Sequence, residues 1–367
     1  MSLFKEFPSV SKEEWLDRVR TELKGREPES LSWSAIEGLD IAPFQHSSEA
    51  VDTGIHLGTQ REDNSWEVGE YIPLSDEDDS NELTLKGLEG GVNAPLFVWP
   101  EAAGKLSFDV LLADIEPSFI SLHFDWSQGG DNVNRLKELS SYLSAFEESK
   151  GSIHLGQTPQ TMNAAELQAM QSFSKQHPDW QLLGIDGRAF YRGDKETIAE
   201  LEQSLVLAAD CLEHLSEKGF SPNQINQHLH VHFLMGTSYL LNIAKLRAWQ
   251  ILWANVLAHY EITEGPMPKL VGHCLPPAAN DAHTNMIRAA TQALSAAIGG
   301  VDRMYVAPAE GGVGNSSSRR TARNVQHLLQ LESGINRVVD PAAGSYYLEG
   351  LSSKLAEQVW AKFIDRK

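Results

Sequence analysis

Residues 319–349 have the sequence RRTARNVQHLLQLESGINRVVDPAAGSYYLE, in which a helical pattern is followed by an apolar pair and a glycine-containing turn. Its first part, up to Glu332, has the composition of a polar-faced helix. Val338 and Val339 then predict a short buried strand, because β-branched residues favour the extended backbone. The residues that follow, 340–347, are rich in Pro, Gly and Ser and predict a tight turn. Helix, strand and glycine-containing turn in this order indicate one unit of an alternating α/β fold.

The same alternation extends back to about residue 90. Short apolar runs predict strands at 96–99, 119–124, 153–155, 182–185, 229–234, 270–275, 304–306 and 338–339. Helical patterns lie between most of them, at 134–148, 164–176, 195–217, 239–260 and 281–298. Alternating strands and helices imply parallel pairing, and eight strands favour a closed (β/α)8 TIM barrel over an open sheet. No G-x-G-x-x-G follows the first strand, which argues against a dinucleotide-binding sheet. We therefore expect residues 61–367 to form this barrel.

Residues 1–60 are expected to form an N-terminal arm. Ser11 and Glu14 have the spacing of a capping box, and Gly25 is placed to end the helix that follows. This helix has one apolar stripe, formed by Trp15, Leu16, Val19 and Leu23. Burial of the stripe on the chain's own barrel and burial on a partner both remain open. The acidic run at 75–82 predicts a solvated loop or the start of a helix.

Composition excludes several classes of function. The chain has 367 residues, and 30 basic against 50 acidic residues give a net charge of −20, which argues against nucleic-acid binding. The two cysteines, Cys211 and Cys274, are too few for a disulfide framework and fit a reducing, cytoplasmic location. No signal peptide and no run of about 18 apolar residues is present, so we expect no membrane span.

Histidines on the expected strands suggest a metal hypothesis. His228, His230 and His232 alternate in HLHVHF, so we expect all three on one face of the fifth strand. His273, on the next strand, could join them, and a carboxylate such as Asp125 or Asp186 could complete a metal site. The alternative is that these imidazoles fill polar layers of the barrel and hydrogen-bond to one another.

A second candidate site is the segment EGGVGNSSSRR at 310–320, which precedes a helix. Backbone N–H groups at that helix start, together with Arg319 and Arg320, could hold a phosphate of CoA or another ligand. The segment lacks the Lys-Ser/Thr ending of a nucleotide P-loop. A capped, flexible connection is the other interpretation.

Three segments of the chain resemble the methylmalonyl-CoA mutase family in the same order. The opening FPSVSKEEWLDRVRTELKG is similar to the N-terminal arm of the family's small subunit. The helix at 240–256 matches the family pattern at Ile243, Ala244, Lys245, Arg247, Leu252 and Trp253. The segment at 319–349 matches the pattern R-N-x-Q, E-S and D-P-x-G-G-S-Y-Y through Arg323, Asn324, Gln326, Glu332 and Asp340 to Tyr347. Ala343 alone departs, where the pattern has its first Gly.

This resemblance implies a barrel whose catalytic members interconvert methylmalonyl-CoA and succinyl-CoA with adenosylcobalamin. In those members the pantetheine arm threads the barrel axis, a Tyr-His pair after the fourth strand holds the substrate, and an Arg pairs with its carboxylate. A separate C-terminal domain with a D-x-H-x-x-G motif binds cobalt. The cofactor supplies the radical chemistry and the protein supplies orientation.

The chain departs from the family pattern at each of these chemical positions. Gly187, Arg188 and Ala189 stand where the Tyr-His pair is expected, and His228 aligns near the family's Arg. The Arg-Gly-Pro-Tyr segment before the first strand is missing. Asp281-Ala-His283 imitates D-x-H without the Gly, and Lys367 ends the chain before a cobalamin domain could begin.

Together these features predict a small, non-catalytic mutase subunit with no cofactor of its own. Its expected partner is a large catalytic subunit that holds the adenosylcobalamin, with the arm at 1–60 as the clasp of a heterodimer; a homodimer of this chain without that partner is also open. Two alternatives remain: a metal-dependent barrel enzyme that uses His228, His230 and His273, and a fragment of a longer chain.

Overall fold

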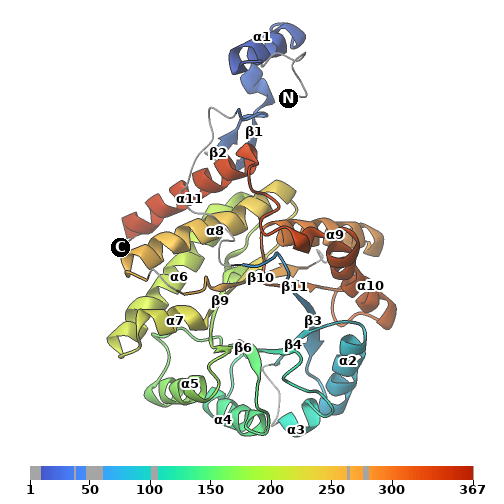
Figure 1. Ribbon diagram of the computed structural model, residues 1–367, viewed down its shortest axis with the longest axis vertical. Coiled ribbons are helices and arrows are strands. Elements are labelled where there is room, and N and C mark those ends of the chain that lie inside the picture. The colour runs from blue at the N-terminus through green and yellow to red at the C-terminus, as the bar shows by residue number, and fades with distance from the viewer. Residues whose placement is uncertain are drawn as a thin grey trace, which may run out of the picture.

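The computed structural model describes residues 10–36, 39–46, 61–100, 106–262, 265–275 and 281–366. Viewed along its short axis, most of the chain forms a ring of parallel strands with helices on the outside (Figure 1). The N-terminal elements project from this ring on one side. The expected (β/α)8 architecture is confirmed.

Nine strands of the described chain form one parallel sheet in the order β7-β6-β5-β4-β3-β11-β10-β9-β8. Their bounds are β3 Glu67–Pro73, β4 Ala94–Val98, β5 Ser121–Asp125, β6 Lys150–His154, β7 Trp180–Gln181, β8 Leu183–Asp186, β9 Leu229–Leu234, β10 Lys269–Cys274 and β11 Arg303–Val306. β7 pairs with β6, and β8 pairs with β9, with Leu182 between the two pieces. They therefore fill one strand position, and the ring closes with eight positions.

Helices follow the strands around the outside of the ring. They are α2 Glu77–Glu89, α3 Phe108–Leu111, α4 Asn132–Leu143, α5 Ala164–Gln176, α6 Thr197–Glu217, α7 Pro222–His228, α8 Tyr239–His259, α9 Ala282–Ile298, α10 Ser316–His327 and α11 Tyr346–Arg366. α10 continues into the π-helical turn η5 (Leu328–Glu332), and the 3-10 turn η6 (Ile335–Arg337) follows. Asp76 caps α2 through the amides of Asp78 and Asp79, so the acidic run at 75–82 begins a helix, as one of its two interpretations predicted. No described helix is long and apolar enough to cross a membrane.

One predicted strand is wrong and one strand was missed. Val338 and Val339 form no strand: they lie in a bend after η6, and Val338 is 57% exposed. The eighth strand position belongs instead to β3, which pairs with both β11 and β4. Asp340 therefore follows an irregular connection and not a strand end.

The strands separate an apolar shell from a polar interior. On β9, Leu229, Val231 and Phe233 belong to the main apolar cluster that packs under the helices, whereas His230 and His232 are buried on the other face. This alternation follows from the period of two along a strand. The barrel interior is therefore lined by side chains that need hydrogen-bond partners.

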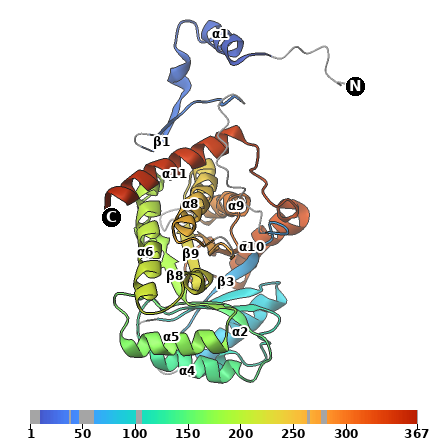
Figure 2. The ribbon, with the colours of Figure 1, turned by 60° about the vertical axis from the view of Figure 1, so that its left-hand side comes forward.

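The N-terminal arm lies outside the ring. Helix α1 (Lys12–Glu22) has the expected Ser11–Glu14 capping box, and none of its residues is buried. A short hairpin of β1 (Trp33–Ile36) and β2 (Leu39–Ile41) contacts α11 and the 3-10 turn η4 (Asp194–Glu196). Figure 2 shows α1 standing beyond this hairpin, away from the barrel. The apolar stripe of α1, in which Trp15 contacts Phe44, is thus only partly covered by the described part of the chain.

Candidate functional site

In a β/α barrel the C-terminal ends of the strands carry the site, and here they hold an ion cluster. Arg188 lies on the 3-10 turn η3 (Gly187–Phe190) directly after β8. Its Nε and NH2 donate to the two carboxylate oxygens of Asp186 at 2.7 and 2.9 Å, and NH2 also donates to Asp125 at 3.2 Å. The guanidinium is therefore bound by carboxylates of the chain itself.

Charge pairing dominates the electrostatics of this cluster. Burial opposes the charge of Arg188, but Asp186 and Asp125 raise its pKa above the ordinary value. Burial would raise the pKa of Asp125, yet His154 and Arg188 hold it below its usual value. One guanidinium thus already faces two carboxylates of the chain, so Arg188 is poorly placed to bind an added carboxylate.

Below the cluster, three imidazoles and a phenol cross the barrel in one hydrogen-bonded chain. Tyr71 Oη lies 2.6 Å from His273 Nδ1, and His273 Nε2 lies 2.8 Å from His232 Nδ1. His232 Nε2 lies 2.7 Å from His230 Nδ1, and His230 Nε2 lies 3.3 Å from the carbonyl oxygen of Ile153. We call these four side chains the imidazole chain. It connects β3, β10, β9 and β6.

A second polar group fills the N-terminal half of the interior. Arg303 Nε donates to Glu67 at 2.8 Å, and its NH1 donates to Ser152 Oγ at 3.0 Å. Ser152 Oγ also lies 2.9 Å from Nδ1 of His123. Burial, together with the nearby Arg303 charge, lowers the pKa of His123 to about 3. This group binds β3, β5, β6 and β11 to one another.

Glycines on two strands make room for these rings. An added Cβ at Gly69 of β3 would lie 2.4 Å from the ring of Tyr305, which stacks on His273. An added Cβ at Gly184 of β8 would lie 2.2 Å from His154 and 2.9 Å from His230. Rings therefore occupy the axis of the barrel at the level of both strands.

The structure corrects the metal hypothesis. His228 is the last residue of α7, and its Nδ1 lies 2.8 Å from the Trp180 carbonyl oxygen, so it does not share the interior face with His230 and His232. His230 and His273 are both in the imidazole chain. Within the described part of the chain, no group of three or more His, Cys, Asp or Glu side chains is placed to hold a metal ion.

The expected phosphate site is also corrected. Arg319 is buried, and its Nε lies 2.9 Å from Glu70 while NH1 and NH2 donate to the carbonyls of Val313 and Tyr71. The side chain of Asn315 accepts from the amides of Ser317 and Ser318 at the start of α10. The first amides of α10 are thus already bound by the side chain of Asn315. Of the two arginines, only Arg320 is exposed.

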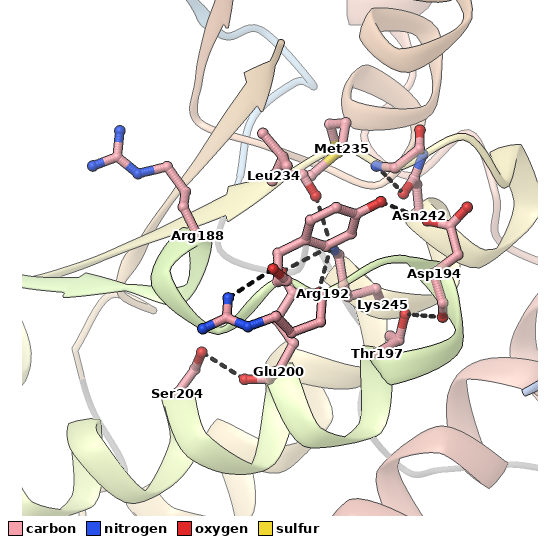
Figure 3. A network of polar contacts seen from close by, with 12 residues as sticks. Arg188, Arg192, Asp194, Thr197, Glu200, Ser204, Leu234, Met235, Asn242 and Lys245 are labelled. Atoms are coloured by element: carbon pink, nitrogen blue, oxygen red, sulfur yellow. Dashed lines mark hydrogen bonds and ion pairs between the residues drawn. The ribbon is translucent and has the colours of Figure 1, made fainter. Parts of the chain in front are cut away.

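Helix α8, which carries the residues that match the family pattern, makes polar contacts with its neighbours (Figure 3). Lys245 is buried, and its Nζ donates to Glu200 of α6 at 3.0 Å and to the Leu234 carbonyl at 2.7 Å. Asn242 donates to the carbonyl of Gly236 and accepts from its amide. These contacts bind α8 to α6 and fix the loop after β9.

The C-terminal segment has the same kind of role. Arg323 donates to Glu70 of β3 at 2.9 Å, and Gln326 donates to the Gly69 carbonyl at 3.0 Å. Asp340 accepts two bonds from Arg247 of α8 at 2.6 and 2.7 Å. Gly344 has φ +79°, whereas Ala343 is not among the residues with positive φ, which explains why a side chain is tolerated there.

Sequence reasoning missed Tyr71, Glu67 and Arg303. The strand Glu67–Pro73 has the sequence EVGEYIP, and its polar residues hid it from a search for apolar runs. The only signal was alternation, with Val68, Glu70 and Ile72 on one face.

A closed parallel barrel with a polar interior is the class of protein that these elements define. The methylmalonyl-CoA mutase family matches residues 153–366, more than half of the chain. The chain therefore belongs to the methylmalonyl-CoA mutase family.

Two curated relatives extend the match to nearly the whole chain. The methylmalonyl-CoA mutase small subunit of Porphyromonas gingivalis is 29% identical over 404 residues, covering 99% of this chain and 63% of that protein. The small subunit of Streptomyces virginiae is 27% identical over 397 residues, covering 99% and 64%. The chain thus spans a little under two thirds of the length of these relatives. A Burkholderia cenocepacia dihydropteroate synthase structure has a TM-score of 0.39 at 11% identity over 74% of this chain and 93% of its own.

Proposed function

We propose that this chain is the small, non-catalytic subunit of an adenosylcobalamin-dependent methylmalonyl-CoA mutase. In this proposal a large partner subunit interconverts methylmalonyl-CoA and succinyl-CoA, and the present chain stabilises that partner in a cytoplasmic heterodimer. Both cysteines are free and buried, which fits a reducing compartment.

The observation that carries the proposal is the imidazole chain across the barrel axis. A linear ligand that lies along the axis needs that space, and here rings of β3, β9, β10 and β11 occupy it. The four side chains of the imidazole chain also make hydrogen bonds there. His230 and His273 are fully buried. Opening the axis would leave several buried polar atoms without partners, which costs about 1–3 kcal/mol for each.

The mouth of the barrel supports the same conclusion. Gly187, Arg188 and Ala189 stand after β8, and Arg188 is bound to Asp186 and Asp125. A guanidinium held by two carboxylates cannot replace a neutral hydrogen-bonding pair that orients an acyl thioester. An added Cβ at Gly187 would meet the His232 carbonyl oxygen at 2.7 Å, so position 187 itself has no room for a larger side chain without rearrangement.

The described residues do not fit the cobalt site of adenosylcobalamin. Asp281 accepts from the amide and hydroxyl of Thr284 and is the N-cap of α9. His283 is exposed in the first turn of the same helix. Because Asp281 caps a helix, its carboxylate is not free to orient a metal-bound imidazole. In this proposal the cofactor therefore binds to the partner subunit.

The test is mutase turnover with methylmalonyl-CoA and adenosylcobalamin. We expect none from this chain alone and full turnover when the chain is co-expressed with the large subunit from the same source. Turnover by this chain alone would contradict the proposal. Equal turnover by the large subunit with and without this chain would remove its stabilising role.

A paired substitution tests the mouth directly. Arg188→Tyr with Ala189→His should give no turnover without the partner, because the imidazole chain still occupies the axis. Activity of this double variant alone would show that two side chains were the whole difference between catalytic and non-catalytic barrels. The single variant Arg320→Tyr, on the exposed face of α10, is the matched control for added bulk.

A further inference from the structure

The imidazole chain has one direction of hydrogen bonding, fixed at its end. The Ile153 carbonyl can only accept, so His230 Nε2 carries a proton and its Nδ1 accepts. His232 must then donate through Nε2 and accept through Nδ1, and His273 must do the same. The Tyr71 hydroxyl completes the chain as a donor to His273. In this order each imidazole is neutral, and each of its two nitrogens is used.

An extra proton on any of the three imidazoles breaks this order. A protonated imidazole has two N–H donors and no acceptor, so any rings between it and Tyr71 would have to exchange tautomers and the Tyr71 hydroxyl would have to turn and accept. The hydroxyl would then lose the acceptor to which it donates, and a second added proton would leave two N–H groups facing each other. Every donor and acceptor of the chain is therefore paired in this order only while all three rings are neutral.

The groups that surround the chain do not compensate such a proton. The titratable and charged side chains packed on it from the other elements are Arg188 of η3, Arg303 and Tyr305 of β11, His154 of β6, His123 of β5, and Cys274 beside Tyr71. Among the described residues, carboxylates approach His123 and His154 at 3.5 and 3.9 Å, and none is found within 4.0 Å of the three rings. Glu67, Asp125 and Asp186 are already bound to guanidinium groups.

We propose that the imidazole chain is a pH-sensitive lock that holds β3, β6, β9 and β10 together while its three rings are neutral and releases them on acidification. The proposal does not depend on the subunit role proposed above. Burial, with the neighbouring cationic groups, lowers the pKa of all three imidazoles well below the ordinary value.

The sign of the effect follows from proton uptake. An unfolded or released imidazole binds a proton below a pH of about 6.5, whereas the locked ring does not until its lower pKa is reached. The stabilising contribution is therefore complete above that pH and is lost as the pH falls. Each ring that must take up a proton lowers the folding equilibrium constant by about ten-fold per pH unit in this range.

Two measurements on the full chain test the lock. Nitrogen-15 NMR of histidine-labelled protein at pH 7.5 should show three rings as neutral Nε2–H tautomers that persist at pH 6. Hydrogen exchange, corrected for the intrinsic rate, should show that amides of β9 and β10 lose protection between pH 7.5 and 5.5 before global unfolding. Charged rings or mixed tautomers at pH 7.5, or unchanged protection at pH 5.5, would overturn the proposal.

A variant pair separates the lock from other histidines. His232→Gln removes one titrating ring, and we expect the pH dependence of the folding constant below pH 6.5 to decrease by about one proton, or ten-fold per pH unit. His259→Gln changes an exposed histidine at the end of α8 and should keep the wild-type dependence. If His232→Gln also keeps the wild-type pH dependence of the folding constant, the His232 ring does not take up a proton when the chain opens, and the lock is refuted. If His232→Gln fails to fold, the wild-type NMR and exchange measurements still decide.

Discussion

Single charged side chains at the mouth of this barrel are paired with one another. Arg188 is held by Asp186 and Asp125, so Arg188→Met leaves two carboxylates beside each other without a cation. We expect the free energy of unfolding at pH 7 to fall by about 3 kcal/mol, as for a broken buried ion pair. The difference from wild type should narrow as the pH falls below about 4, because Arg188 helps to hold the Asp125 pKa below its usual value and that contribution disappears as the carboxyl is protonated. Urea unfolding at several pH values measures this, with exposed Arg320→Met expected to leave stability unchanged; equal stability of both variants would contradict it.

The same scale shows what sequence can and cannot predict about a site. The alternation of HLHVHF placed His230 and His232 on one interior face, because the period of a strand is a local property. The prediction that His228 shares this face was wrong, because α7 extends to His228 and the strand begins only at Leu229. The pairing of Arg188 with Asp125, 63 residues away, depends on the closure of the ring. No local pattern could have shown that Arg188 already has its carboxylates.

At the scale of elements, buried ion pairs attach helices to the barrel. Glu70 on β3 forms ion pairs with Arg319 and Arg323 of α10, at 2.9 Å each. Glu70→Gln would leave two guanidinium groups without their carboxylate, and we expect a loss of about 3 kcal/mol in the free energy of unfolding, measured by urea denaturation. Hydrogen exchange should show α10 losing protection first. Glu82→Gln on α2, an exposed partner of Lys86, is the matched control and should change nothing measurable. A loss no larger than that of the control would show that hydrogen bonds alone attach α10.

Elements also explain where the fold prediction failed. Seven of the predicted strands were apolar runs facing the helical shell, and they were found because burial makes them apolar. β3 was missed because Glu67 and Glu70 are polar for reasons of tertiary structure: their partners Arg303 and Arg323 lie more than 200 residues away in the chain. Residues 338–339 were assigned in its place because two valines suit a strand, yet no strand of the ring pairs with them. The predicted number of eight strands was right only because one missed strand, β3, and one wrongly predicted strand, at 338–339, cancelled each other.

For the whole molecule, the question is how the arm is attached. The α11 residue Gly350 lies under Gln45, and an added Cβ would come within 2.4 Å of the Gln45 side-chain oxygen. A Cβ alone would displace only the flexible end of Gln45, whereas the larger side chain of Gly350→Leu should also loosen the β1–β2 hairpin on α11 while the barrel stays folded. Hydrogen exchange of β1 and β2 should accelerate with the urea midpoint of the barrel unchanged. Unchanged exchange in the hairpin would mean that other contacts hold the arm.

The arm also gives the sharpest test of partner binding. Trp15 of α1 packs on Phe44 at a ring distance of 4.8 Å, and Phe44 and Trp33 remain 42% exposed. An apolar surface that projects from a complete barrel is exposed at a free-energy cost unless another chain covers it. If that chain is the large mutase subunit, Trp15→Ala should weaken co-purification of the two subunits at least ten-fold and leave the isolated barrel's stability unchanged. Phe119→Ala, which removes an 83% exposed aromatic from the barrel itself, should leave co-purification intact. If Phe119→Ala weakened co-purification and Trp15→Ala did not, the partner would contact the barrel and not the arm.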